Sequence, residues 1–295
     1  MSGARIGAGP EVPGEEQGGL WSAISPRDMA RDEQVAGEPD RGGIIFRAGD
    51  IAAFATIAVR QFRHWPAFLS EAARQAALIA TGSVFVIVAI AFLAGGSCGL
   101  ESSSLARAFG TRPIAAGFSS WCTLREVVPF VFGYILAAKV GCGIVAELGA
   151  MRVNEEVDAL EAMGVRSMAH LVASRLLACA VVLPIAYLLA VGAAYLASYL
   201  MSAQRFADVS GGTWSLFFYL FQDPVDLLYS VIKGLVISAF VIVTALYYGY
   251  NVRGGPSEVG VATARAMAVN IMAVTLISTV GTMLFWGANP RIPFG

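Results

Sequence analysis

Long apolar runs, separated by short polar segments, dominate the hydropathy pattern of this chain. A helix needs about 20 apolar residues to cross the hydrocarbon core of a bilayer, and five runs are long enough. Gly and Pro occur inside these runs, which membrane helices tolerate because small residues let neighbouring helices approach closely. The pattern therefore predicts an all-α, polytopic membrane protein, with spanning helices over residues 76–94, 127–150, 176–201, 227–250 and 266–286.

The N-terminal part of the chain has a different pattern. Residues 1–43 are rich in Gly, Glu, Asp, Arg and Pro and hold few large apolar residues, which predicts a disordered cytoplasmic tail. Residues 44–72 place apolar side chains, Ile51 and Phe54 among them, at helical spacing with basic residues between. We predict a helix in the membrane interface, with Pro66 near an elbow into the first span. The alternative is a cytosolic helix that packs on the first span.

Composition supports the membrane class and excludes others. Hydrophobic residues make up 57% of the chain and charged residues 14%, whereas a soluble domain carries about 25% charged residues. A net charge of −1 without a basic stripe excludes a strongly basic nucleic-acid binder. The four Cys lack metal-ligand spacing, so no metal site is predicted. An integral-membrane enzyme would need catalytic side chains clustered near an aqueous mouth, and no such cluster stands out.

The distribution of Lys and Arg predicts the orientation, because cytoplasmic loops carry an excess of these residues. If the N-terminal segment is cytoplasmic, so are the loop between the second and third spans and the loop between the fourth and fifth. That side then holds 13 basic residues against 5 on the other, with Lys139 and Lys233 left inside spans. We therefore expect a multi-pass protein of the plasma (inner) membrane with a cytoplasmic N-terminus.

The second span runs directly into an acidic segment, so that residues 141–165 begin apolar and end charged. Acidic residues near a helix start are favoured by the helix dipole, and Gly164 is suited to end the helix. The segment combines an acidic strip, Glu155, Asp158 and Glu161, with an apolar strip, Leu160 and Met163. It either presents both strips to a partner with a complementary groove or is a solvated loop helix.

Three charged residues of the second span also need an explanation. Arg125 and Glu126 lie where the span begins on the predicted outer side, and Lys139 follows Arg125 by 14 residues. In a regular α-helix this spacing puts Arg125 and Lys139 within about 40° of one face. Charges inside a membrane usually face a cavity or a partner. The three residues either contact lipid head groups or form a gate, or they are structural, with Glu126 neutralising Arg125 and Lys139 snorkelling.

Two further charged residues are expected to be structural. Lys233 in the fourth span is predicted to snorkel towards the interface. Glu147 lies at the cytoplasmic mouth of the second span, where it is expected to pair with Lys139 or Arg152.

The Cys residues fall into two groups. Cys98 and Cys122 are both predicted to lie in the first outer loop, where they either form a disulfide in an oxidising compartment or remain free thiols. Cys142 and Cys179 lie in apolar runs and are expected to be small packing residues.

Several motifs of this chain resemble the MlaE/YrbE permeases, the membrane subunits of ABC-type lipid transporters that work with MCE-domain proteins. The motifs are the sequences LREVVP at 124–129, AELGAMR at 146–152, EEVDALEAMG at 155–164 and, more weakly, the segment 249–265. The resemblance covers roughly residues 44–286 and leaves the N-terminal tail outside. The sequence KVGCG at 139–143 is more similar to the actinobacterial YrbE form than to the proteobacterial one.

The resemblance implies a permease domain over residues 44–295 that pairs with a second permease, identical or paralogous, and works with an ATPase subunit and MCE-domain proteins. It implies a cytoplasmic coupling helix over about 151–163 that docks on the ATPase, with a smaller contact from residues 252–259. The implied docking residues are Met151, Arg152, Glu155, Glu156, Asp158, Leu160 and Glu161. The chain has no GxxxxGK[ST] loop, so ATP hydrolysis is expected on the partner and no cofactor is expected here.

The expectation is therefore a lipid-transporting permease subunit, and the alternative is a scaffold subunit of the same kind of complex that does not transport. The apolar spans are suited to hydrophobic substrates in general and do not indicate which lipid is transported or in which direction.

Overall fold

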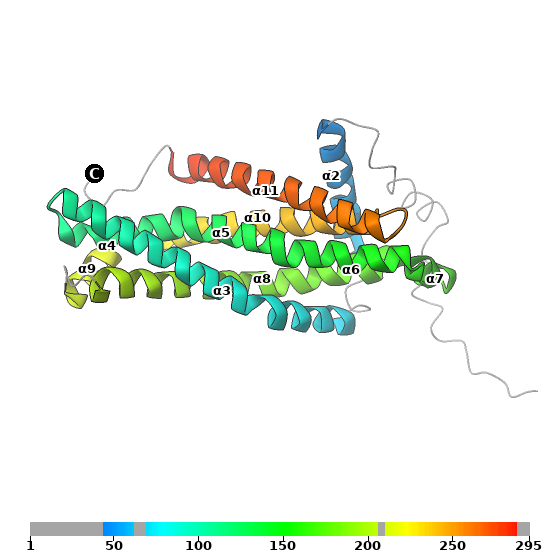
Figure 1. The fold of residues 1–295 in the computed structure, drawn as a ribbon, viewed down its shortest axis with the longest axis horizontal. Helices are drawn as coiled ribbons and strands as arrows, with labels where there is room; N and C mark the ends of the chain where they lie inside the picture. The colour runs from blue at the N-terminus through cyan, green and yellow to red at the C-terminus, as the bar shows by residue number, and fades with distance from the viewer. Residues whose placement is uncertain (1–43, 62–68, 206–209, 288–295) are drawn as a thin grey trace, which may run out of the picture. The chain divides into compact units, whose positions relative to one another are not determined.

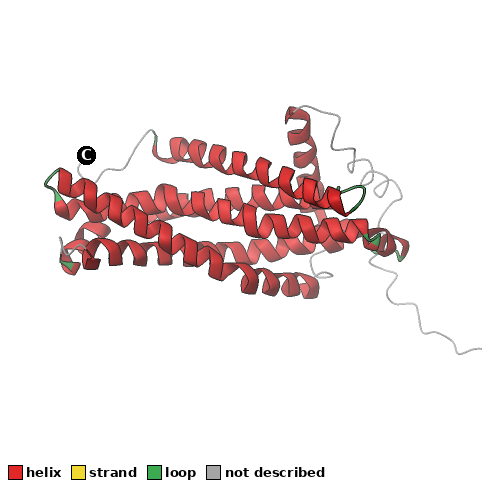
Figure 2. Ribbon diagram, viewed as in Figure 1, coloured by secondary structure: helices red, strands yellow, loops and turns green. Residues whose placement is uncertain are grey.

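The computed structural model describes residues 44–61, 69–205 and 210–287. The predicted tail, residues 1–43, and the predicted elbow at Pro66 lie outside these residues. All regular structure within them is helical (Figure 2), which confirms the all-α class.

Five helical stretches are long and apolar enough to cross a membrane, so the five predicted spans are confirmed. Each stretch is longer than the apolar run that predicted it, because more polar turns continue the helix beyond the apolar residues. The five stretches are Leu69–Ala108, Arg112–Val153, Met168–Ser202, Pro224–Tyr250 and Pro256–Trp286.

Three of the stretches are single α-helices: α3 (Leu69–Ala108), α10 (Pro224–Tyr250) and α11 (Pro256–Trp286). The second stretch is composite, and its segments are η2 (Arg112–Ile114), α4 (Ala115–Trp121), η3 (Cys122–Val127), α5 (Val128–Ile135), η4 (Leu136–Gly141) and α6 (Cys142–Val153). The third comprises η5 (Met168–Ala173), α8 (Ser174–Tyr199) and the start of η6 (Leu200–Arg205). Short helices α7 (Glu156–Ala162) and α9 (Gly211–Leu220) follow the second and third stretches.

The two π-helical segments η3 and η4 change which side chains of the second span share a face. A π-helical turn takes an extra residue, so the helix that follows is rotated by about 100° relative to a regular α-helix. Arg125 is buried, whereas Lys139 is exposed. The prediction that the two share a face is therefore wrong, because it assumed an unbroken α-helical period.

The predicted interfacial helix is shorter than expected, since α2 covers Ile44–Gln61 and residues 69–72 belong to α3. Phe54 is buried and its ring lies 5.7 Å from that of Tyr247 and 6.2 Å from that of Tyr250, both in α10. Among the described residues the helix packs on the fourth span and on η5 (Met168–Ala173) at the start of the third, whereas the cytosolic alternative proposed the first span.

Small residues bring α3 and α8 into close contact. A Cβ on Gly95 would lie 2.2 Å from the carbonyl oxygen of Ala194, and one on Gly99 would lie 2.8 Å from that of Ser198. Gly95 and Gly99 are four residues apart in α3, and so are Ala194 and Ser198 in α8. Each helix therefore presents small residues on one face, and the two backbones approach directly. This contact is the most extensive helix pairing of the described residues.

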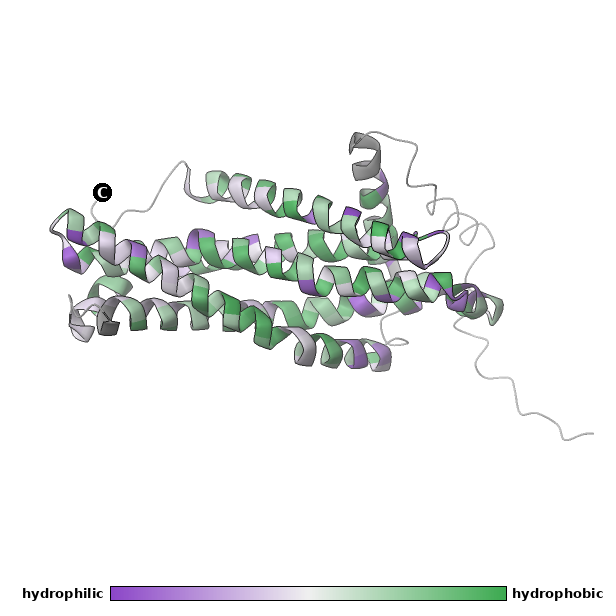
Figure 3. Cartoon of the chain, in the orientation of Figure 1, coloured by the Kyte–Doolittle hydropathy of each residue, from purple (hydrophilic) through white to green (hydrophobic). Residues whose placement is uncertain are grey.

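The ends of the helical bundle differ in composition. The start of α3, the end of α6 and α7 lie at one end, and α4 and α9 lie at the other (Figure 1). Apolar residues cover the middle of the helices, and hydrophilic ones gather around α7 and the first turns of α3 (Figure 3). Charged side chains near α7 are therefore placed where a bilayer would end.

Candidate functional site

The acidic segment forms a separate short helix, not a continuation of α6. Glu155 has a left-handed backbone, with φ of 59°, which interrupts the helix between Val153 and Glu156. The predicted single coupling helix over 151–163 is therefore wrong in its bounds, because a left-handed residue cannot continue the α-helical hydrogen bonding. The predicted C-cap is confirmed: Gly164 has φ of +76° and its N–H donates to the carbonyl of Glu161.

Polar contacts fix α7 to the adjoining helices. Arg152 Nη1 lies 2.9 Å from Asp158 Oδ1, and the Arg152 guanidinium stands 5.3 Å from the ring of Tyr250 in α10. The hydroxyl of Ser167, just before η5, donates to Glu161 and lies 2.8 Å from the Tyr250 hydroxyl. The helix is thus tied to the second, third and fourth spans at once.

The predicted docking residues divide into an exposed group and an inward group. Glu155, Glu156, Asp158 and Glu161 are exposed, as the acidic strip predicted. Met151, Arg152 and Leu160 are half-buried, and Met151 and Leu160 pack against the apolar core. Val157 is 1% exposed and holds the helix on the bundle. The surface that α7 offers is therefore acidic, and most of its apolar side faces inward.

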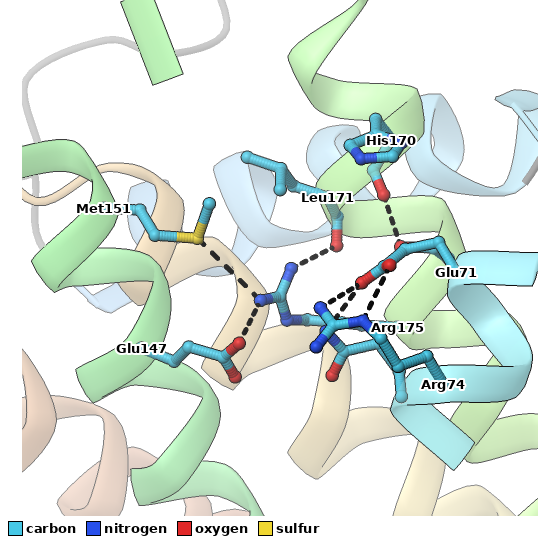
Figure 4. Close-up of polar contacts among 9 residues, drawn as sticks. Glu71, Arg74, Glu147, Met151, His170, Leu171 and Arg175 are labelled. Carbon is cyan, nitrogen blue, oxygen red and sulfur yellow. Dashed lines mark hydrogen bonds and ion pairs between the residues drawn. The ribbon is translucent and has the colours of Figure 1, made fainter. Parts of the chain in front are cut away.

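An open pocket of ≈ 510 Å³ lies behind α7, between α3, α6 and the start of the third span. Its charged lining includes Glu71 and Arg74, whose Arg74 Nη2–Glu71 Oε1 distance is 2.7 Å. Figure 4 shows this pair beside Arg175, with Met151 and Glu147 on the opposite side. Leu160 of α7 and Met163, directly after it, line the same pocket, so a displacement of α7 would change its width.

Arg175 joins the second and third spans at the pocket. Its Nη2 lies 2.7 Å from Glu147 Oε1, and its Nη1 donates to the carbonyl of Leu171 at 3.0 Å (Figure 4). Glu147 therefore pairs with neither Lys139 nor Arg152, and that expectation is wrong. Arg175 lies just before the predicted third span, residues 176–201, but α8 begins at Ser174 and the Arg175 side chain is buried.

Two of the motifs that carry the family resemblance, AELGAMR at 146–152 and the segment 249–265, lie side by side at the α7 end of the bundle. A Cβ on Gly149 would lie 2.9 Å from Val259 and 3.2 Å from Val252. A Cβ on Gly249 would lie 3.0 Å from Leu148. Residues 252–259 are thus packed on α6 just before α7, because glycine lets the other element approach. Residues 256–259 of this segment form the first turn of α11.

Arg125 is neutralised by a residue that the sequence analysis did not single out. Its Nη2 lies 2.6 Å and its Nε 3.1 Å from Asp226 Oδ2 in the first turn of α10. The guanidinium also stands 4.5 Å from the Trp121 ring, and Trp286 Nε1 donates to Asp226 Oδ1 at 2.8 Å. The structural alternative named Glu126 as the partner of Arg125, and this is wrong because each side chain meets a different residue of α10, Asp226 for Arg125 and Lys233 for Glu126.

Glu126 pairs with Lys233 instead. The Lys233 Nζ lies 3.2 Å from Glu126 Oε2, and it donates to the carbonyl of Arg125 at 2.8 Å and to Thr282 Oγ1 at 2.7 Å. The Lys233 side chain is fully buried, so the prediction that it snorkels is wrong. We call Arg125, Glu126, Asp226 and Lys233 the buried charge cluster, of which Glu126 is half-buried and the other three are buried. The first two belong to the second span and the last two to the fourth.

Lys139 stands apart from this cluster. It is exposed, and the described residues make no polar contact with it. The three residues predicted as a lipid pathway or gate are therefore not brought together: Arg125 and Glu126 face the fourth span, and Lys139 faces away from the protein.

Cys98 and Cys122 are joined by a disulfide, with their Cα atoms 6.0 Å apart. The expectation that both lie in a loop is wrong, because α3 continues past Cys98 to Ala108 and Cys122 opens the π-helical segment η3. The bond links the first and second spans, and Cys122 directly follows α4, which lies at the end opposite to α7 (Figure 1).

The sequence contained a signal for Asp226, the partner of Arg125 that was not predicted. Asp226 is an acidic residue at the start of an apolar run, where no solvent-facing role requires it. A charge in that position generally has a buried partner. Which cation it meets follows only from the packing of α10 on the second span.

Comparison with known proteins gives two findings. The family model described as "Permease MlaE" matches residues 72–284. A "Probable ABC transporter permease protein" of Rickettsia bellii is 25% identical over 238 residues, covering 81% of this chain and 92% of the relative. The "Intermembrane phospholipid transport system permease protein MlaE" of Haemophilus influenzae is 24% identical over 248 residues, covering 82% of this chain and 92% of the relative.

Proposed function

The chain belongs to the MlaE permease family, and from that premise we propose that it is the membrane subunit of an ABC-type lipid transporter. A separate ATPase subunit hydrolyses ATP, and MCE-domain proteins exchange lipid with this permease. The phospholipid transport named for the Haemophilus influenzae relative supports a lipid cargo. The sequence has no phosphate-binding loop of its own, which is consistent with ATP hydrolysis on a partner.

The observation that carries the proposal is the placement of α7. Its acidic side chains Glu155, Glu156 and Asp158 are exposed, while Val157 is buried beneath them. A helix that is fixed on one side and charged on the other is suited to receive a partner and to pass its motion on. We assign the docking of the ATPase to this surface, with a smaller contact from the adjoining residues 252–259.

The contacts of α7 indicate how motion would spread. Arg152 belongs to α6, Ser167 precedes η5, and Tyr250 ends α10, so a shift of α7 acts on three spans together. Packed helices can tilt or slide past one another without unfolding, as in hinge and shear changes of other proteins. Closure of the ATPase subunits would in this way rearrange the spans around the cargo.

Charge and disulfide placement support a cytoplasmic α7 in the inner membrane. The excess of Lys and Arg falls on the N-terminal side, to which α7 belongs. The Cys98–Cys122 bond lies at the opposite end, and disulfides persist in oxidising compartments outside the cytoplasm.

A second permease subunit would cover the first and fifth spans. Only 17% of the apolar window of α3 and of α11 is buried inside the chain, against 56% for the second span. These two helices therefore leave the largest faces for lipid or for another permease. Arg125, Glu126 and Lys139 are proposed to border the lipid path, the first two through the buried charge cluster and Lys139 directly.

Reversal of the charge on α7 tests the docking assignment. We expect the variant E155K/E156K/D158K to insert in the membrane but to lose its ATPase subunit on co-purification. The control is Glu101→Lys, which reverses an exposed acidic charge in the half of α3 away from α7. Co-purification that is unchanged in the triple variant, or lost equally in the control, would contradict the assignment.

Transport itself separates the permease from a scaffold. We expect ATP-dependent lipid movement in vesicles reconstituted with the complex, and none when this chain is omitted. Persistence of movement without the chain would favour the scaffold.

A further inference from the structure

Lys139 places a positive charge near the middle of the membrane. It lies 14 residues after Arg125 and 13 before Arg152, the charged residues that mark the two ends of the second span. At 1.5 Å per residue each of these is about 20 Å away along the helix. The hydrocarbon core of a bilayer is about 30 Å thick, so Lys139 lies close to its centre.

The protein leaves the space around Lys139 open. The neighbouring Ala138 and the next-turn residues Gly143 and Ala146 are exposed, and a Cβ on Gly143 would meet no atom within 4 Å. Small residues thus continue the face on which Lys139 lies. Its counterpart Lys233 is enclosed by the buried charge cluster, which shows that this fold can neutralise an intramembrane lysine where it is structural.

An unpaired ammonium at this depth is unfavourable. The four-carbon stem of lysine is much shorter than the half-thickness of about 15 Å, so snorkelling does not bring the charge to the interface. Lys139 therefore requires an anionic group that comes from outside the chain.

A second copy of the chain does not supply that group. In the part of the chain that the structure describes, the spanning helices carry acidic residues only towards their ends. Glu126 and Asp226 are held by Lys233 and Arg125, and Glu147 is held by Arg175 near α7. A transported lipid, by contrast, would carry its charged group through the membrane centre past Lys139.

We propose that Lys139 binds the anionic group of the transported lipid, a carboxylate or a phosphate, as the lipid passes the middle of the bilayer. The inference rests on the proposed lipid transport and narrows it to lipids with a net negative head group. Small residues at 138, 143 and 146 leave room for the acyl chains beside the lysine.

The test measures lipid binding and does not depend on ATP. The full-length protein, purified with its co-purifying subunits into nanodiscs, is titrated with fluorescent phosphatidylglycerol, oleate or phosphatidylcholine. We expect Lys139→Gln to weaken binding of phosphatidylglycerol or of oleate by roughly tenfold or more, the loss of one charge-assisted hydrogen bond. Phosphatidylcholine binding should be unchanged, and Lys139→Arg should retain most of the affinity. The anionic lipid whose binding falls distinguishes a phosphate from a carboxylate as the ligand.

The control is Arg265→Gln, which removes an exposed cation nearer the α7 end of the bundle and should affect none of the three lipids. Equal losses for all three lipids in Lys139→Gln, or no loss, would overturn the inference. Separation of paired permease subunits in Lys139→Gln, seen by native mass spectrometry, would also overturn it, because Lys139 would then contact protein. Failure of the proposed function has a different signature: the unaltered complex would move no lipid on addition of ATP.

Discussion

Charged side chains are paired between helices at one end of the second spanning helix and exposed at the other. At one end Arg125 and Glu126 are paired with Asp226 and Lys233, and the four groups lie between helices. At the other end the acidic residues of α7 are exposed, and Arg152 and Ser167 hold Asp158 and Glu161 to the adjoining helices. The difference teaches that the same kind of residue holds the spans together at one end and remains available to a partner at the other.

The largest expected effect is on the buried charge cluster. Asp226→Ala leaves the Arg125 guanidinium, whose side chain is 11% exposed, without its carboxylate. Loss of one partner of a buried ion pair costs about 3–5 kcal/mol, and thermal unfolding of the purified protein in detergent would measure it. The double variant R125M/D226L removes both charges and should recover much of that loss. If the double variant is no more stable than Asp226→Ala, the unpaired charge of Arg125 is not the cause of the lost stability.

Packing of α3 should differ between the same two ends. Gly95→Ala puts a methyl group 2.2 Å from the backbone of α8, near the disulfide, and should destabilise the protein by about 1–3 kcal/mol. Gly82→Ala, in the half of α3 towards α7, meets no atom within 4 Å. The second variant should be neutral or stabilised by up to about 1 kcal/mol in the same unfolding measurement. Equal losses in both variants would contradict a tight contact confined to the half of α3 away from α7.

A smaller and local effect is expected beneath α7. Val157→Ala removes buried methyl groups and should loosen the helix by roughly 1–3 kcal/mol without the same loss in global stability. Hydrogen exchange of the amides over 156–165 would report the opening. Ala159→Ser, on the exposed side, is the control and should leave exchange unchanged. Protection that stays the same in Val157→Ala would mean that the polar contacts alone hold α7.

The smallest change is expected at the left-handed residue. A residue with a side chain destabilises the fold by about 1–2 kcal/mol in this left-handed conformation. Glycine avoids that cost, but it loses more backbone entropy on folding, which offsets part of the gain in stability. Glu155→Gly should therefore change unfolding stability by less than about 1 kcal/mol, in the stabilising direction, while it weakens co-purification of the ATPase. A clear loss of stability would indicate that the Glu155 side chain holds α7 in place and is not reserved for a partner.

Much of the fold could be predicted because spanning helices need long apolar runs, and such runs are visible without knowledge of their neighbours. The acidic strip of α7 and its end at Gly164 were predictable for a similar reason, since local spacing and backbone preference determine both. The left-handed Glu155 was not, because nothing in the local sequence favours a break in the helix there.

The pairing of charges was where the sequence-based predictions failed. Arg125 and Asp226 are 101 residues apart, and Lys233 is 107 residues from Glu126. Position along the chain favoured nearby partners in each case, as it did for Glu147. The π-helical segments added a second error, because they rotate the helix between Arg125 and Lys139 by an amount that hydrophobic periodicity does not record.

The sequence by itself determined the class of protein, its five spans and the exposed acidic strip beside the second of them, because these depend on hydrophobicity and on local helical spacing. The tertiary structure alone decided which charges are neutralised and which are left open. Lys233 is enclosed by three polar groups from two other spans, and Lys139 by none of the described residues. The physical reason is that a charge in a membrane is stabilised by whichever group packing brings against it, and packing joins residues that the chain keeps far apart.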